Sequence, residues 1–135
     1  MSESRSHINL VQVAYEYIKN IVPEDKKVLI EIDSADSNKP REVDGRFIPD
    51  VQFWDDSLYI IGEAKTINDF EREHSREQYV AYIKECGNFN GKSMLVVAVP
   101  WQLVITAKNY FRRIKCTNEN FRVVILNELG GAFEI

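Results

Sequence analysis

The sequence predicts an α/β fold in which helices flank a mixed β-sheet. Three segments place apolar residues at the spacing of an amphipathic helix, and five short segments are rich in the residues typical of strands. These segments follow one another in the order α-β-β-β-α-β-α-β. The 135 residues are enough for one hydrophobic core and too few for two, so residues 1–135 are expected to form a single domain.

The first half of the chain supplies one helix and three strands. The helix ends before Pro23, and its apolar residues recur at helical spacing: Leu10, Val13, Ala14, Tyr17, Ile18 and Ile21. Strands are predicted over residues 28–32, 46–54 and 58–65. The Asp and Ser residues at positions 55–57 favour a tight turn, which would make the last two strands a hairpin. Residues 34–44 indicate a surface loop.

The second half alternates helix and strand. Residues 69–86 predict a helix that ends at Gly87, and the apolar run 94–99 predicts a strand buried on both faces. A third helix follows Pro100, with one apolar stripe made of Leu103, Val104, Ala107, Phe111 and Ile114. Residues 121–126 supply the last strand, and two glycines at positions 130 and 131 mark a turn before a short C-terminal tail.

The net charge of −4 and the isoelectric point near 5.2 exclude a polycation that grips nucleic acid nonspecifically. The charges are unevenly placed. Residues 1–67 carry 8 basic and 13 acidic side chains (net −5), whereas residues 92–126 carry 6 basic and 1 acidic (net +5). No apolar run approaches the roughly 20 residues of a membrane span, and the N-terminus lacks a secretory signal. We therefore expect a cytoplasmic protein without a membrane partner.

One region concentrates residues that carry chemistry. Glu63 and Lys65 lie two positions apart on a predicted strand, so their side chains point to the same face. Asp50 lies on the partner strand, and the turn at residues 55–57 would bring it across from Glu63. Two carboxylates and an ammonium would then converge, a set suited to holding Mg²⁺ and hydrolysing a phosphodiester. The competing interpretation is an exposed ion pair between Glu63 and Lys65, with Asp50 as a turn residue.

Pro49-Asp50, followed after the hairpin by Glu63-Ala64-Lys65, resembles the PD-(D/E)XK nuclease superfamily. Gly45 ahead of the Pro-Asp pair is also similar to that family, and so is the Q-x-x-x-Y element formed by Gln78 and Tyr82. The resemblance covers about three-quarters of the chain. It implies an α-β-β-β-α-β core of the restriction endonuclease-like fold, here with an added α-β. It also implies a metal-dependent nuclease that hydrolyses nucleic acid, with DNA the favoured substrate.

The resemblance assigns roles to individual residues. Asp50 and Glu63 would ligate Mg²⁺ or Mn²⁺ with help from the Ala64 carbonyl, and Lys65 would be the catalytic lysine. Gln78 would join the catalytic set at the rim, touching substrate or the lysine, and Tyr82 would contact nucleic acid. Many members add a glutamate from the first helix, where Glu16 is the only acid. Glu16 lies more than about 100° from the apolar stripe, so a solvated surface glutamate is an equal alternative.

Outside this region, basic residues of the third helix form a ridge separate from its apolar stripe. Lys108, Arg112 and Lys115 recur at i, i+4 and i+7, and Arg113 lies beside them. The ridge would contact phosphates in a nuclease, and a solvated charged face is the alternative. Trp101 could stack on bases, although packing is its ordinary role. His7 and His74, the only two histidines, have no metal-ligand spacing.

A domain of this size has little surface for reading bases, so a homodimer or a larger protein complex is expected. Two other functions remain open from the sequence. One is a non-catalytic nucleic-acid-binding or assembly subunit with a nuclease-like fold, which the acidic net charge favours. The other is a structural homodimer without nucleic acid.

Overall fold

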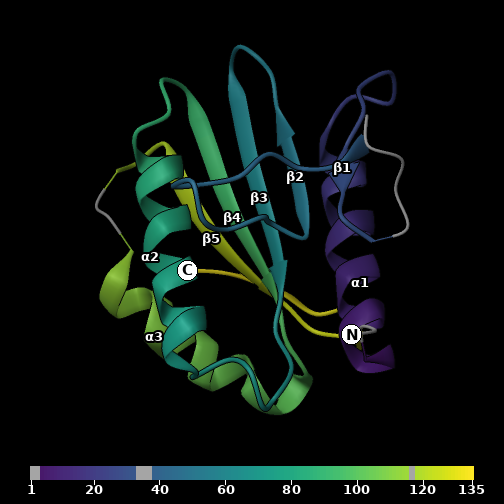
Figure 1. Cartoon of the computed structure of the whole chain (residues 1–135), viewed down its shortest axis with the longest axis vertical. Helices are drawn as coiled ribbons and strands as arrows, with labels where there is room; N and C mark the ends of the chain where they lie inside the picture. Colours follow the sequence, from purple (N-terminus) through teal and green to yellow (C-terminus); the bar gives the residue numbers. More distant parts are fainter. Residues whose placement is uncertain (1–3, 33–37, 116–117) are drawn as a thin grey trace.

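The computed structural model describes residues 4–32, 38–115 and 118–135 and forms a mixed six-stranded sheet with three α-helices (Figure 1). The strands lie in the spatial order β1-β2-β3-β4-β5-β6. Their bounds are β1 Leu29–Ile30, β2 Val51–Trp54, β3 Leu58–Ala64, β4 Lys92–Ala98, β5 Phe121–Leu126 and β6 Ala132–Glu134. The helices are α1 Arg5–Ile21, α2 Glu73–Gly87 and α3 Val104–Ile114, and a 3-10 turn, η2, spans Trp101–Leu103.

The α/β class and the mixed sheet expected from the sequence are confirmed. β3, β4 and β5 run parallel, whereas β1, β2 and β6 pair antiparallel with their neighbours. β6 was not expected, because the tail after the glycine turn holds only three strand residues. The side chain of Asn127 holds this turn by accepting the N–H groups of Leu129 at 2.8 Å and Gly131 at 3.0 Å.

β1 is shorter than the expected range 28–32, and the expected starts of β2 and α2 were wrong. β2 begins at Val51 rather than at residue 46, because Asp44 and Gly45 adopt φ angles of 57° and 64° and turn the chain. The turn is closed by an isolated bridge between Val43 and Phe47. α2 begins at Glu73 rather than at residue 69, since a separate turn precedes it. The first part of the loop expected over residues 34–44 lies outside the described residues.

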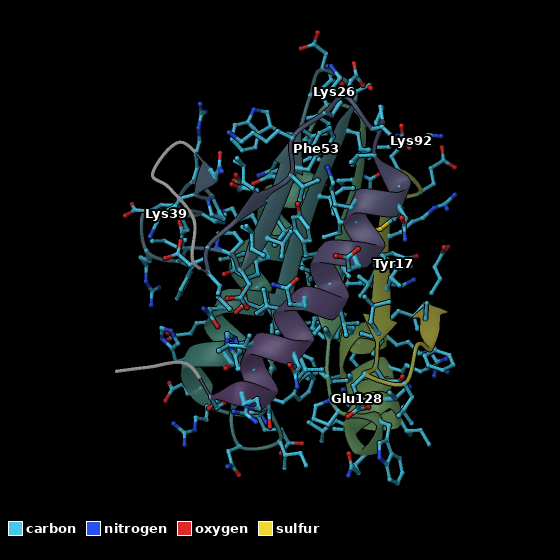
Figure 2. All side chains as sticks on the ribbon, turned by 90° about the vertical axis from the view of Figure 1, so that its right-hand side faces the viewer. Tyr17, Lys26, Lys39, Phe53, Lys92 and Glu128 are labelled. Atoms are coloured by element: carbon cyan, nitrogen blue, oxygen red, sulfur yellow. The ribbon has the colours of Figure 1, made fainter. Side chains whose placement is uncertain are left out.

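Helices cover both faces of the sheet. α1 alone covers one face and buries Leu10, Val11, Ala14 and Ile18 against the strands. Figure 2 shows α1 lying lengthwise across this face. Its N-terminus is capped by Ser4, whose hydroxyl accepts the N–H of His7 at 3.1 Å.

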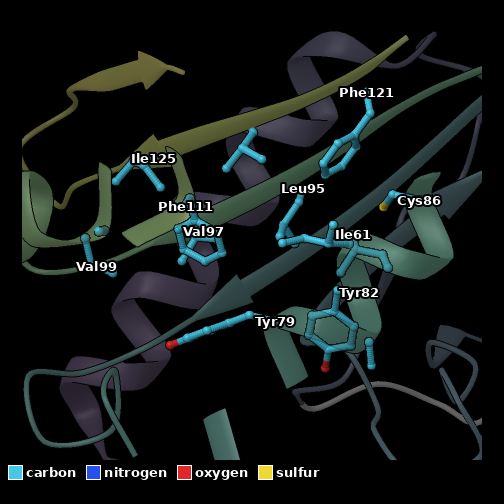
Figure 3. Close-up of a cluster of buried hydrophobic side chains, with 14 of the residues drawn as sticks. Ile61, Tyr79, Tyr82, Cys86, Leu95, Val97, Val99, Phe111, Phe121 and Ile125 are labelled. Atoms are coloured by element: carbon cyan, nitrogen blue, oxygen red, sulfur yellow. The ribbon is translucent and has the colours of Figure 1, made fainter. Parts of the chain in front are cut away.

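α2 and α3 pack on the opposite face, where the larger core cluster lies. Aliphatic side chains of β3, β4 and β5 meet aromatic residues of both helices there (Figure 3). Tyr79 and Tyr82 are fully buried at the border of this cluster, and Figure 3 shows their hydroxyl oxygens pointing away from the aliphatic side chains. The Tyr79 hydroxyl donates to the Phe70 carbonyl at 2.8 Å. Buried hydroxyls of this kind require hydrogen-bond partners, so polar groups lie at the border of the core.

The three parallel strands are buried along nearly their whole length, which matches their continuous apolar sequences. Their carboxyl ends meet at one edge of the sheet, because Ala64 of β3 pairs with Ala98 and Ala98 pairs with Leu126. Ligands of α/β sheets commonly bind beyond such carboxyl ends. Glu63 and Lys65 lie at this edge.

Gly62 of β3 permits the close approach of α1. A Cβ atom at this position would lie 2.9 Å from Ile18 Cδ1 and 3.0 Å from Val51 Cβ. We expect Gly62→Ala to lower the free energy of unfolding by about 1–3 kcal/mol, because the core must shift to admit the methyl group. Denaturant unfolding measures the loss, and adding Ile18→Val should restore part of it. Wild-type stability in Gly62→Ala would contradict this packing.

Across the helices that the structure describes, none combines the length and the apolar character needed to cross a membrane.

Candidate active site

Asp50 and Glu63 are brought together by the pairing of β2 with β3. The pairing of Val51 with Gly62 sets the preceding Asp50 opposite Glu63. The Asp50 N–H donates to Glu63 Oε1 at 3.3 Å, and the Ala64 N–H donates to Asp50 Oδ2 at 2.9 Å. Each carboxylate is therefore fixed by a backbone N–H of the other strand. Asp50 is 9% exposed and Glu63 is 4% exposed, so the pair lies just beneath the surface.

Lys65 and Gln78 complete this cluster. Lys65 Nζ lies 3.4 Å from Glu63 Oε2 and donates a short hydrogen bond to Gln78 Oε1. The Lys65 N–H donates to the Ala98 carbonyl at 3.0 Å, which extends the parallel pairing of β3 and β4 by one residue. Both residues are 8% exposed. The structure thus brings together Asp50, Glu63, Lys65 and Gln78, and the Glu63–Lys65 pair is buried rather than an exposed ion pair.

Tyr82 lies beneath the carboxylates and not on a surface that nucleic acid could reach. It follows Gln78 by one turn of α2, and its hydroxyl donates to Glu63 Oε1 at 3.2 Å. Its side chain is completely buried. The expectation that Tyr82 contacts nucleic acid is therefore corrected, because the residue is buried and its hydroxyl binds Glu63.

The electrostatics of the cluster centre on Glu63. Burial and the negative charge of Asp50 together raise the pKa of Glu63 to about 8, although the ammonium of Lys65 opposes both effects. Burial, together with Glu63 and Asp50, also raises the pKa of the Tyr82 hydroxyl, which therefore remains a proton donor at neutral pH. The raised pKa reflects the cost of ionising Glu63 in a buried position beside Asp50, and a cation bound to both carboxylates would offset that cost.

His7 is the site residue that the sequence did not indicate. Its Nε2 lies 3.4 Å from Asp50 Oδ2, and its side chain is 14% exposed. The contact arises because the first turn of α1 crosses the sheet next to the start of β2, a tertiary arrangement without a signature in the sequence. His74, by contrast, is exposed, and its ring packs edge-on against Phe47 with the centroids 5.4 Å apart.

Glu16 is not brought to the cluster. It is exposed on α1, nine residues after His7. At about 100° and 1.5 Å per residue, it lies roughly 13 Å along the helix from His7 and on the opposite side. The structure supports the alternative of a solvated surface glutamate.

The donor atoms at the cluster fit Mg²⁺ or Mn²⁺. Within the ranges that the structure describes, no three His, Cys, Asp or Glu side chains are arranged to hold a metal ion. Mg²⁺, however, is commonly held by one or two carboxylates and keeps several waters. Asp50 and Glu63 supply two carboxylates, and the Ala64 carbonyl points to the same strand edge as the Ala64 N–H, which contacts Asp50. All three belong to the expected ligand set.

The basic residues of α3 lie apart from this cluster. α3 packs on β5, two strands from β3, which is about 10 Å at the usual strand spacing. Lys108 Nζ lies 5.2 Å from the centre of the Phe133 ring, and Arg112 donates to Asn109. Arg113 is exposed and Lys115 is half-buried. The ridge is thus a surface feature that lies apart from the cluster of Asp50, Glu63 and Lys65.

Tyr110 of α3 lies within the electrostatic reach of two arginines from different helices. Arg76 of α2 and Arg113 of α3 both act to lower the pKa of the Tyr110 hydroxyl, whereas burial raises it more strongly. Tyr110 itself packs on the rings of Phe70 and Tyr79 with centroids 5.9 and 5.5 Å away. Its role is packing, and Arg76 extends the basic surface of α3 onto α2. Sequence reasoning missed Arg76 because the two helices are separate in the chain.

None of the protein-family models matches the chain. No curated protein and no solved structure matches it either.

Proposed function

We propose that this protein is a Mg²⁺- or Mn²⁺-dependent nuclease that hydrolyses phosphodiester bonds of nucleic acid, with DNA the favoured substrate. One observation carries the proposal: the buried set of Asp50, Glu63 and Lys65 at the carboxyl edge of the sheet. Asp50 and Glu63 are fixed by each other's strands, and Lys65 is fixed by Gln78. Such prior positioning is what electrostatic catalysis requires.

Asp50, Glu63 and the Ala64 carbonyl would hold the ion, and His7 lies close enough to Asp50 to orient its carboxylate. When bound, Mg²⁺ or Mn²⁺ lowers the pKa of a coordinated water and offsets charge on the scissile phosphate. The fit rests on the donor set, because two carboxylates fixed side by side supply the oxygen ligands that Mg²⁺ takes in proteins.

Lys65 would act on the reacting phosphate. Its ammonium is held between Glu63 and Gln78 and can stabilise the negative charge that develops on the phosphate oxygens. Gln78 accepts a hydrogen from Lys65, so it sets where the ammonium points. Gln78 is therefore a positioning residue for Lys65 in this mechanism.

The basic surface of α3 and Arg76 would hold phosphates outside the reacting bond. Lys108, Arg112, Arg113 and Lys115 retain this proposed role. A small domain buries little protein surface against DNA by itself. A homodimer or a larger complex is accordingly part of the proposal.

A cleavage panel tests the proposed function. Purified protein is incubated with Mg²⁺ or Mn²⁺ and linear, circular, single-stranded and branched DNAs, beside the Asp50→Ala variant. We expect metal-dependent cleavage that Asp50→Ala abolishes, and calorimetric Mn²⁺ binding that the same variant loses. Metal-dependent cleavage by the purified variant would contradict the mechanism.

The non-catalytic nucleic-acid-binding or assembly subunit remains the second candidate. The low exposure of the cluster, between 4 and 9% for its charged residues, favours it. It predicts DNA binding without cleavage and without Mn²⁺ binding that depends on Asp50.

The buried tyrosines offer a matched test of the metal site. Tyr82→Phe removes the hydroxyl that donates to Glu63, whereas Tyr79→Phe removes one that donates to the Phe70 carbonyl. Both variants should lose about 1 kcal/mol of unfolding free energy, as for a buried hydrogen bond. We expect only Tyr82→Phe to weaken Mn²⁺ binding, by roughly tenfold, because it releases a metal-ligating carboxylate. Equal Mn²⁺ affinities in calorimetry would exclude a supporting role for Tyr82.

A further inference from the structure

A second polar site lies one helical turn away from the carboxylate cluster, on the same interface of α2 and β3. It is a pocket of about 380 Å³ lined by Arg41, Gln52, Trp54, Tyr59, Glu85 and Phe89, among others. This volume is at the small end of the range for ligand pockets. None of these residues takes part in the proposed hydrolysis.

The base of the pocket is a directional chain of hydrogen bonds. The Arg41 N–H donates to Gln52 Oε1 at 2.7 Å, Gln52 Nε2 donates to the Tyr59 hydroxyl at 3.0 Å, and Tyr59 donates to Glu85 Oε2 at 3.0 Å. Gln52 is 2% exposed and Tyr59 is 7% exposed, so the chain lies deep. Every donor points toward Glu85, where the chain ends on a carboxylate. A carboxylate has about four lone-pair sites and Tyr59 uses one, so the pocket presents an acceptor to a ligand.

The upper part of the pocket is aromatic and cationic. The guanidinium of Arg41 lies 4.6 Å from the centre of the Trp54 ring, and Trp54 is 36% exposed. Phe89 packs edge-on against Tyr59 with the centroids 5.6 Å apart. Indole and guanidinium surfaces of this kind stack on planar heterocycles. The pocket therefore offers the flat surfaces of Trp54 and Arg41 together with the carboxylate of Glu85 as a hydrogen-bond acceptor.

The pocket and the carboxylate cluster are neighbours. Tyr59 and Glu63 lie four residues apart on the same face of β3, and their partners Glu85 and Tyr82 lie three residues apart on α2. Residues 41–47 run between the two sites, since the Arg41 N–H donates to Gln52 while Phe47 packs on Tyr82. A strand of nucleic acid advances about 3.4 Å per nucleotide when stacked, so a few nucleotides reach from one site to the other.

We propose that this pocket binds one unpaired nucleobase that carries an amino group, from the nucleic acid whose phosphate lies at the carboxylate cluster. The role in substrate choice rests on the proposed nuclease function, whereas base binding itself does not. Glu85 accepts the amino hydrogens, as a carboxylate accepts from the cytosine amino group. Thymine and uracil carry a carbonyl oxygen in place of the amino group, so only their ring N3–H can donate to Glu85, and the carbonyl oxygens beside it would repel the carboxylate. Burial and Glu85 raise the pKa of the Tyr59 hydroxyl, which keeps the chain of donors intact at neutral pH.

Intrinsic fluorescence tests the pocket directly. The chain has two tryptophans, so the Trp101→Phe variant reports on Trp54 alone. This variant is titrated with the 5′-monophosphates of deoxycytidine, deoxyguanosine, deoxyadenosine and thymidine. We expect the three amino-bearing nucleotides to quench Trp54 and to bind roughly tenfold more tightly than thymidine monophosphate. Equal binding of all four, or no response of Trp54, would overturn the proposal.

Glu85→Gln tests the role of the carboxylate, because glutamine keeps the shape of the side chain and replaces one acceptor oxygen by an NH₂ donor. We expect it to reduce the preference for amino-bearing nucleotides to less than about threefold. Glu73→Gln, an exposed carboxylate on the same helix, is the control and should keep the full preference. Should Glu85→Gln fail to fold, Trp54→Phe with nucleotide binding measured by calorimetry replaces it, and loss of affinity is expected. An unchanged preference in folded Glu85→Gln contradicts the assignment.

The same variants separate this proposal from the nuclease. Base binding without any metal-dependent cleavage would contradict the proposed nuclease function and support the proposed base-binding pocket. Cleavage without base binding would support the nuclease function and contradict the proposed base-binding pocket. Where both hold, Glu85→Gln should also flatten the base preference of single-strand cleavage.

Discussion

Lys65→Ala is expected to reduce metal-dependent cleavage by about 100- to 1,000-fold while leaving Mn²⁺ binding measurable. The ammonium of Lys65 is held by Glu63 and Gln78, and it is the cation available to stabilise charge developing on the phosphate. Removing one such preorganised group commonly costs two to three orders of magnitude in rate. Single-turnover cleavage at saturating Mg²⁺ measures the loss.

Two further variants make the result specific. Lys65→Met keeps most of the buried volume and should be as inactive as Lys65→Ala, so a packing defect cannot account for both. Lys92→Ala removes an exposed lysine at the opposite end of the sheet and should cleave at the wild-type rate. Activity within tenfold of wild type in folded Lys65→Met would remove Lys65 from the mechanism.

The fold could be predicted where local pattern and tertiary burial agree. The buried strands β3, β4 and β5 and the amphipathic helices α1 and α3 lie close to their expected positions, because each carries a continuous or periodic apolar signal. β2 was overextended, since the apolar residues at 47 and 48 belong to a turn closed by Val43 and Phe47. β6 was missed because a three-residue strand is determined by its pairing with β5 rather than by its own composition.

The candidate site divides in the same way. The spacing of Asp50, Glu63 and Lys65 could be read from a hairpin, because strand alternation and a short turn determine which side chains meet. The contact of His7 with Asp50 could not, since it depends on where α1 crosses the sheet. The role of Tyr82 was misjudged for a related reason: helical periodicity marks a residue as buried or exposed but does not name its hydrogen-bond partner.

Glu63 also makes the stability of the metal-free protein depend on pH. Its pKa of about 8 in the folded chain exceeds the ordinary value of 4.5, so between these values the folded state holds a proton that the unfolded state has released. This stabilising contribution is fully present below pH 4.5 and is lost as the pH rises through 8. Over that interval Glu63 should lower the free energy of unfolding by up to a few kcal/mol.

Glu63→Gln should remove this pH dependence, because glutamine stays neutral and resembles the protonated carboxyl in shape. Without metal, its free energy of unfolding relative to wild type should therefore be higher at pH 8.5 than at pH 4.5. Glu16→Gln, a change at the exposed glutamate of α1, should follow the wild-type profile. At pH 8.5, Mg²⁺ should raise the free energy of unfolding of wild type and not that of Glu63→Gln, because a bound cation favours the ionised carboxylate. If the free energy of unfolding of wild type and Glu63→Gln changed with pH in the same way, with and without Mg²⁺, Glu63 would be neither the source of the pH dependence nor a metal ligand.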